Sequence, residues 1–90
     1  MKWTILLSRL ASEFLKHAKI SEEEVFDCIR KSLLKFQGGN VNIDIKKLQG
    51  VWDGFYRIRK GKIRLIAEFN FDVRSVFIEQ IDWRGNVYKK

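Results

Sequence analysis

Apolar residues recur every four positions in the stretch "SRLASEFLKHAKI", which begins at Ser8. Leu10, Phe14 and Ala18 would lie on one face of a helix, because a helix completes a turn about every 3.6 residues. Ser8 is of the residue type that caps helices, since its hydroxyl can accept a backbone N–H of the first turn. The pattern predicts an amphipathic helix that begins after Ser8.

A second helical pattern follows, with signals at both of its ends. Ser21 and Glu24 form an S-x-x-E capping box, in which each side chain can bond the other residue's backbone N–H. Gly38 and Gly39 are typical of a helix C-terminus. Because the link between the two helices is short, we expect them to form a hairpin. The predicted buried face of the second helix consists of Val25, Cys28, Ile29, Ser32, Leu33 and Phe36.

Strand patterns lie on both sides of the helices. "KWTILLS" predicts a short first strand, and from Gly50 onward the hydrophobic period changes to two. "FYRIR", "KIRLIAEF", "SVFIEQIDW" and "NVY" predict successive antiparallel strands, connected by Lys60-Gly61, "NFDV" and Arg84-Gly85. We therefore predict one α+β domain over residues 1–90. It has a short N-terminal strand, a two-helix hairpin and an antiparallel sheet of three to four strands, with the helices packed on one face.

The predicted hairpin "YRIRKGKIR" sorts its side chains by charge. With Lys60-Gly61 as a two-residue loop, Arg57 lies opposite Arg64. Alternation then divides the residues between two faces. The face toward the helices carries Tyr56, Ile58, Ile63, Leu65, Ala67 and Phe69, and the other carries Arg57, Arg59, Lys62 and Arg64.

The concentration of cations on this hairpin admits two interpretations. Like charges across strands destabilise a sheet, and no acid occurs between Asp53 and Glu68. The first interpretation is a solvated face that prevents edge-to-edge aggregation. The second is a phosphate-binding face, for which the planar donors of arginine are suited.

Net charge strengthens the case for an acidic partner. The chain carries 18 Lys and Arg against 11 Asp and Glu, a net charge of +7. Residues 1–45 contribute +1 and residues 46–90 contribute +6. Such asymmetry is typical of proteins that bind nucleic acid, a membrane surface or an acidic protein, and charge alone does not choose among them.

The remaining composition bears on compartment and cofactors. Cys28 is the single cysteine, so no internal disulfide and no Cys/His zinc cluster is expected. The apolar run from Trp3 to Leu7 is too short for a signal peptide or a membrane helix. We expect a cytoplasmic protein without a membrane association, without a cofactor and without a metal.

The C-terminal stretch "IDWRGNVYKK" interleaves cations with aromatic residues. Arg84, Tyr88 and the terminal Lys89 and Lys90 suit single-stranded RNA, whose bases stack on aromatic rings while cations neutralise the backbone. For Trp83 we favour a place in the core.

Three motifs together resemble the RelE toxins of the RelE/ParE superfamily. They are "IDIKKLQG", "GFYRIRKGKIRLIAEF" and "IDWRGNVYK", which cover residues 43–90, and the rest of the chain matches by element order. The resemblance implies the toxin of a type II toxin–antitoxin system, with an antitoxin as partner and a possible hetero-oligomer. It also implies a ribosome-dependent mRNA endonuclease, or mRNA interferase, which needs no metal. In that reaction the ribose 2′-hydroxyl attacks the adjacent phosphate in the ribosomal A site and leaves a 2′,3′-cyclic phosphate.

The resemblance also implies roles for individual residues. Arg57, Arg64 and Arg84 would stabilise the phosphate and the transition state, and Arg59 matches the second basic position of its strand. Tyr88 would stack on a base or help to activate the 2′-hydroxyl. The residues expected to hold ribosomal RNA backbone are Lys46, Lys47, Lys60, Lys62, Lys89 and Lys90.

One departure from the family concerns the general base. The best-known members have lysines at the positions of Arg57 and Arg59, and arginine accepts a proton poorly because its pKa exceeds ~12. The base is therefore unassigned, as are Glu68 and Glu79. His17, the only histidine, falls on the first helix and is expected to be a surface or partly packed residue. Leu48 and Gly50 are interpreted as packing and turn residues.

Two other functions fit the same sequence. The ParE-like toxins, which act on DNA gyrase, share the fold and the antitoxin partnership but generally lack the basic and aromatic cluster. A basic RNA-binding module without catalysis would bind with a strong salt dependence and would release no cyclic phosphate.

Overall fold

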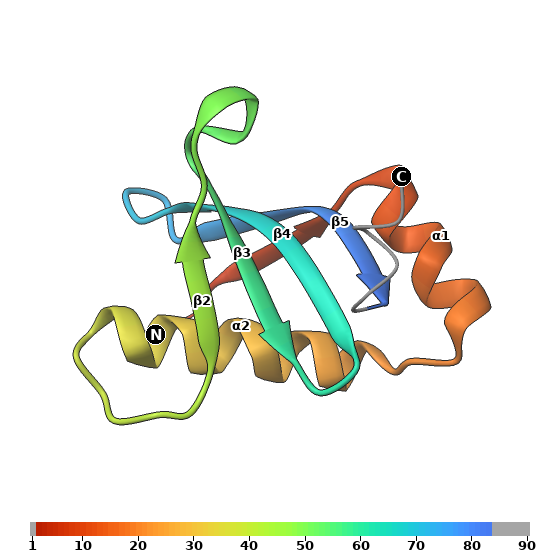
Figure 1. The fold of residues 1–90 in the computed structure, drawn as a ribbon, viewed down its shortest axis with the longest axis horizontal. Helices are drawn as coiled ribbons and strands as arrows, with labels where there is room; N and C mark the ends of the chain where they lie inside the picture. The colour runs from red at the N-terminus through yellow and green to blue at the C-terminus, as the bar shows by residue number, and fades with distance from the viewer. Residues whose placement is uncertain (1, 84–90) are drawn as a thin grey trace.

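The structure is a computed structural model that describes residues 2–83 (Figure 1). Its elements are β1 (Thr4–Leu7), α1 (Arg9–Ala18), α2 (Glu22–Phe36), β2 (Asp44–Lys47), a 3-10 turn (Gly50–Trp52), β3 (Phe55–Lys60), β4 (Ile63–Asn70) and β5 (Ser75–Trp83). The strands form one sheet in the order β1-β5-β4-β3-β2. β1 runs parallel to β5, whereas the other neighbouring strands are antiparallel.

The helix boundaries follow from local hydrogen bonds that the sequence predicted. The Ser8 hydroxyl accepts the Ala11 N–H at 3.0 Å and caps α1, and Ser21 accepts the Glu24 N–H at 3.3 Å and caps α2. At the other end of α2, Gly38 has a φ of +89°. The Gly39 N–H donates to the Leu34 carbonyl at 2.9 Å, which is the 6→1 bond of a Schellman cap.

Both helices pack against the same face of the sheet. α2 contacts β3, and α1 contacts β5 and β1. In Figure 1, α2 runs across the sheet, while α1 lies at the β5 side, so each helix finds its main partner in the sheet rather than in the other helix. The buried core consists of Ala11, Val25, Cys28 and Ile29 from the helices, Ile43 before β2, and Ile58, Ile63, Leu65, Ala67, Val76, Ile78 and Ile81 from the strands.

The predicted α+β class and element order are confirmed, and the sheet is larger than predicted. It has five strands within residues 2–83, because β1 joins β5 at one edge and β2 joins β3 at the other. β2 was not predicted as a strand. The predicted strand "NVY" lies outside the described residues. Trp83 contacts Phe14 with ring centroids 5.5 Å apart and packs against the core, as expected.

The hairpin between β3 and β4 has a different register from the predicted one. Lys60 pairs with Ile63, so the two-residue loop is Gly61-Lys62. Gly61 has a φ of +61°, and a positive φ at the first loop position is what a type II′ turn requires. The prediction placed the glycine second in the loop. None of the helices within residues 2–83 is long and apolar enough to cross a membrane.

Candidate nucleic-acid interface

The face of the sheet opposite the helices carries two rows of paired residues. One row crosses four strands from Asp44 through Arg59 and Arg64 to Asp82. The next runs from Lys46 through Arg57 and Ile66 to Gln80. The predicted division of faces holds for the residues within β3 and β4, because the observed and predicted registers differ by an even number of residues, whereas Lys62, predicted on the arginine face, lies in the loop. The predicted pairs do not hold, since Arg64 lies opposite Arg59, and Arg57 lies opposite Ile66.

Asp44 binds both arginines of β3. Arg59 donates from Nε to Asp44 Oδ2 at 2.8 Å, and its Nη2 lies 2.6 Å from the same oxygen. Arg57 Nη2 donates to Asp44 Oδ1 at 3.1 Å. Hydrogen bonding from Arg59, together with the charges of Arg59 and Arg57, lowers the pKa of the Asp44 carboxyl below its ordinary value. Asp44 is therefore ionised at neutral pH and neutralises part of the arginine charge.

The three arginines differ in how far they are withdrawn from solvent. The side chains of Arg57 and Arg59 are 14% and 29% exposed, and Arg64 as a residue is only 7% exposed. Among residues 2–83, the Nε of Arg57 is a buried N–H that has no hydrogen-bond partner in the structure. Unsatisfied buried donors are uncommon in folded proteins. It belongs to the same guanidinium group whose Nη2 donates to Asp44.

The lysines assigned to RNA binding do not all lie with the arginines. Lys46 shares their face, because it pairs with Arg57. Lys47 is on the opposite face of the edge strand. Lys60 ends β3 on the helix side, where its Nζ lies 3.7 Å from Asp27. Lys62 is exposed in the hairpin turn.

Four candidates at the C-terminus, Arg84, Tyr88, Lys89 and Lys90, lie outside the described residues. His17 is exposed on α1, in agreement with the expectation for it. Glu68 is exposed on the arginine face, opposite Phe55. The backbone carbonyl of Glu79 accepts a hydrogen bond from the Ser8 hydroxyl at 2.6 Å. Within residues 2–83, no group of three or more His, Cys, Asp or Glu side chains could hold a metal ion.

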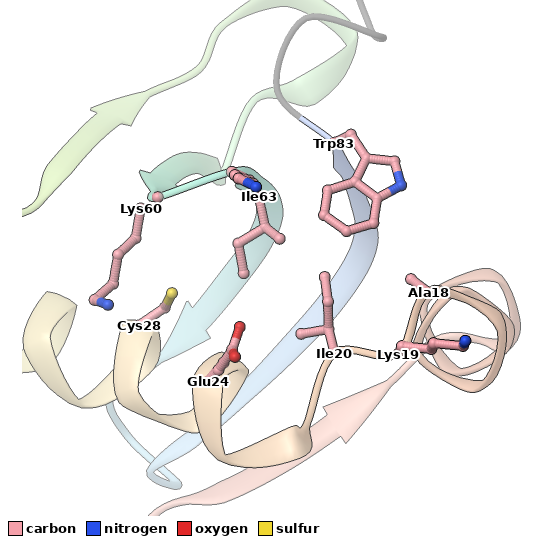
Figure 2. A pocket seen from close by; sticks show the side chains of 10 residues that line it. Ala18, Lys19, Ile20, Glu24, Cys28, Lys60, Ile63 and Trp83 are labelled. Atoms are coloured by element: carbon pink, nitrogen blue, oxygen red, sulfur yellow. The ribbon is translucent and has the colours of Figure 1, made fainter.

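Two pockets flank the hairpin. The first, of about 450 Å³, lies beside Asp44 and is lined by Lys31, Asn42, Ile43, Asp44, Arg59, Lys60 and Gly61. The second, of about 280 Å³, lies on the helix side (Figure 2). Glu24, Cys28 and Lys60 line one part of this second pocket, with Ile20 and Trp83 across from them. Burial raises the pKa of the Cys28 thiol to about 11, so at neutral pH it is not a nucleophile.

Sequence reasoning missed Asp44, which binds two of the candidate arginines. The count of acids between Asp53 and Glu68 followed the chain, whereas the acids opposite Arg59 and Arg64, Asp44 and Asp82, come from the neighbouring strands β2 and β5. A signal was present in "NIDIKK", where Ile43 and Ile45 alternate with Asp44 and Lys46. This alternation is typical of a strand with one buried face.

Solved structures share this architecture at low sequence identity. A chain of the RelB–RelE antitoxin–toxin complex from Methanococcus jannaschii is 24% identical, with a TM-score of 0.61, over 92% of this chain and 94% of that chain. A chain of the RelBE2 toxin–antitoxin complex from Mycobacterium tuberculosis is 20% identical, with a TM-score of 0.60, over 93% and 100%. A metal-bound toxin from Helicobacter pylori is 12% identical, with a TM-score of 0.70, over 97% and 100%.

No protein-family model matches the chain, and no curated protein does. The structural likenesses cover nearly the whole length of both partners in each comparison. The chain therefore has the fold of the RelE-like toxins.

Proposed function

We propose that this chain is the toxin of a type II toxin–antitoxin system and that it cleaves mRNA in the ribosomal A site. The observation that carries the proposal is the arrangement of Arg57, Arg59 and Arg64 on one face of the sheet, partly or largely withdrawn from solvent. Partly desolvated arginines interact more strongly with a phosphate than fully solvated ones do. The fold shared with chains of toxin–antitoxin complexes supports the same role.

The arginines act electrostatically in this mechanism. The ribose 2′-oxygen attacks the adjacent phosphorus while its proton passes to a base, and the bond to the 5′-oxygen breaks as that oxygen gains a proton. The products are a 2′,3′-cyclic phosphate and a 5′-hydroxyl. Negative charge gathers on the phosphorane oxygens in between, where donors of Arg57 and Arg64 would stabilise it. Arginine remains protonated throughout, so the base is another group, with Tyr88 as the candidate that the resemblance offers.

An acidic antitoxin is the proposed partner. The net charge of +7 favours association with an acidic protein. Two of the similar structures are toxin–antitoxin complexes, with RelB as the antitoxin in the archaeal one. A protein encoded beside this chain should bind it and relieve growth arrest. If the neighbouring protein does neither, the toxin assignment loses its support.

The test of the nuclease is a programmed ribosome with a defined message in the A site, analysed by primer extension. We expect a new 5′ end within the A-site codon and a cyclic phosphate on the upstream fragment. The same message without ribosomes is the control and should stay intact. A folded protein that yields no cut would overturn the nuclease proposal, and a gyrase cleavage-complex assay would then test the ParE-like alternative.

A further inference from the structure

The contact between Asp44 and the two β3 arginines has the form of an occupied anion site. Its carboxylate oxygens receive donors from Arg57 Nη2 at 3.1 Å and from Arg59 Nε at 2.8 Å. Arginine grips carboxylates and phosphates with the same fork of parallel N–H donors. A phosphate oxygen could therefore take the place of either carboxylate oxygen. The buried, unpartnered Nε of Arg57 would offer it a further donor.

Asp44 is placed where it can give way to another anion. It is the first residue of β2, a four-residue strand at the edge of the sheet, and its side chain is 46% exposed. Exposed ion pairs contribute little to stability because water screens them and competes for their donors. The carboxylate can therefore leave the arginines without disrupting the core.

The adjacent pocket provides space for the incoming group. Asp44 and Arg59 line the pocket of about 450 Å³, together with Lys31, Lys60 and Asn42. Asp27 lies 3.3 Å from Lys31 and 3.7 Å from Lys60. Asp27 offsets only part of this positive charge, because it also lies 3.7 Å from Arg30, and Asp44 is the carboxylate that pairs with the arginine donors.

We propose that Asp44 is an internal competitor for the phosphate-binding site of Arg57 and Arg59, and that a substrate phosphate displaces it. The part that names RNA as the source of the phosphate rests on the proposed function. The anion site itself does not, since it follows from the contacts of Asp44. In the free protein the carboxylate lowers the affinity of the arginines for phosphate groups in general.

Titration with inorganic phosphate tests the competition directly. The probes are the ¹⁵N-labelled Nε–H signals of Arg57 and Arg59 at low ionic strength and neutral pH. We expect Asp44→Asn to bind phosphate about tenfold more tightly than wild type, because it removes a negative charge a few ångströms from the anion. Asp72→Asn is the matched control, since it removes the same charge from the exposed turn between β4 and β5, and it should change the affinity less than twofold.

Two results of the phosphate titration would overturn the proposal. If Asp44→Asn binds phosphate as wild type does or more weakly, Asp44 aligns the arginines rather than competing, and the proposal is wrong. A wild-type measurement covers the case in which the variant does not fold. The carboxyl ¹³C signal of Asp44 should then move with the same midpoint as the Arg59 Nε signal. A stationary Asp44 signal during saturation of the arginines would overturn the proposal.

The phosphate titration and the ribosome assay test the two proposals separately, so either proposal can be rejected while the other is retained. Tighter phosphate binding by Asp44→Asn without any A-site cleavage by wild type would retain the anion site and reject the nuclease. A-site cleavage by wild type with unchanged phosphate affinity in Asp44→Asn would retain the nuclease and reject the competition.

Discussion

The same strands form two chemically different faces of the sheet, one apolar and buried, the other charged. Toward the helices, β3 and β4 present Ile58, Leu65 and Ala67, all fully buried. On the other face, the intervening positions present Arg57, Arg59 and Arg64, and in the strand register Arg59 lies opposite Asp44 of β2 and Arg64 opposite Asp82 of β5. Each residue faces one side or the other by the period of two. A single alternating sequence thus specifies a core and a charged surface.

The comparison shows that the charged face is not simply a solvated one. Arg64 is 7% exposed and Ile66 5% exposed, although both helices lie on the other side. The arginines of this face are therefore partly or largely withdrawn from solvent, whereas the Asp44 carboxylate that pairs with two of them is 46% exposed.

The largest expected effect is the loss of stability caused by a core substitution on the helix-facing side of the sheet. Ile58→Ala should lower the free energy of unfolding by about 2–5 kcal/mol, because it leaves a cavity beneath α2. Urea denaturation measures this loss. The matched control is Val51→Ala at an exposed position in the 3-10 turn, which should cost under about 0.5 kcal/mol. Similar losses for the two variants would contradict the assignment of the core to this face.

The second-largest expected effect is that of a substitution on the charged face, which should lower the rate of mRNA cleavage rather than the stability of the fold. Arg64→Gln should reduce A-site cleavage by about 10²–10³-fold, since one donor to the developing phosphorane charge is lost. Glutamine retains much of the buried stem, which matters because Arg64 is buried and alanine would also remove packing.

Two further variants show whether the effect of Arg64→Gln is specific to the arginine side chain. Arg64→Lys keeps the charge and loses the planar fork, so we expect a rate between those of wild type and Arg64→Gln. His17→Gln, at an exposed position on α1, should cleave as wild type does. Normal cleavage by folded Arg64→Gln would remove Arg64 from the proposed site.

Features set by residues close together in the sequence were predictable, whereas features set by residues far apart in the sequence were not. The caps at Ser8, Ser21 and Gly38 involve residues a few positions apart, so residue type alone predicted them. The division of faces in β3 and β4 was also predictable, because alternation survives a shift of register by two residues. The exact pairs were not, since the loop position of Gly61 decides them.

The acids of the charged face show where sequence reasoning fails. Asp44 and Arg59 are 15 residues apart along the chain and meet only because β2 pairs with β3. β2 has four residues, and such a short alternating stretch gives a weak signal on its own. A count of charge along the chain therefore described the hairpin as purely cationic, while the fold supplies Asp44 and Asp82 from the neighbouring strands.

Two adjacent lysines of β2 lie on opposite faces of the sheet, so substituting each in turn removes the same charge from one face or the other. Lys46 lies on the arginine face and Lys47 on the other, and both are exposed. Lys46→Gln should reduce the slope of log K against log salt for ribosome binding by about 0.9, the value expected for one lost phosphate contact. Lys47→Gln should leave the slope unchanged. Equal changes would mean that RNA contacts both faces of this edge.

The smallest expected effect concerns the pH dependence of the pair between Asp44 and Arg59. The arginines lower the folded-state pKa of Asp44 below its ordinary 3.8. A depressed carboxyl pKa adds stability above the unfolded-state pKa, and this contribution disappears as pH falls through the folded-state value. Asp44→Asn should thus cost under about 1 kcal/mol at pH 5–7, because the pair is exposed, and nothing near pH 2. Urea unfolding at several pH values measures the difference, and Arg59→Gln is the background that should abolish most of it. A cost that is the same at pH 2 and pH 7 would show that Asp44 stabilises β2 through packing, and the contrast between an apolar core face and an electrostatic outer face would then fail at this edge.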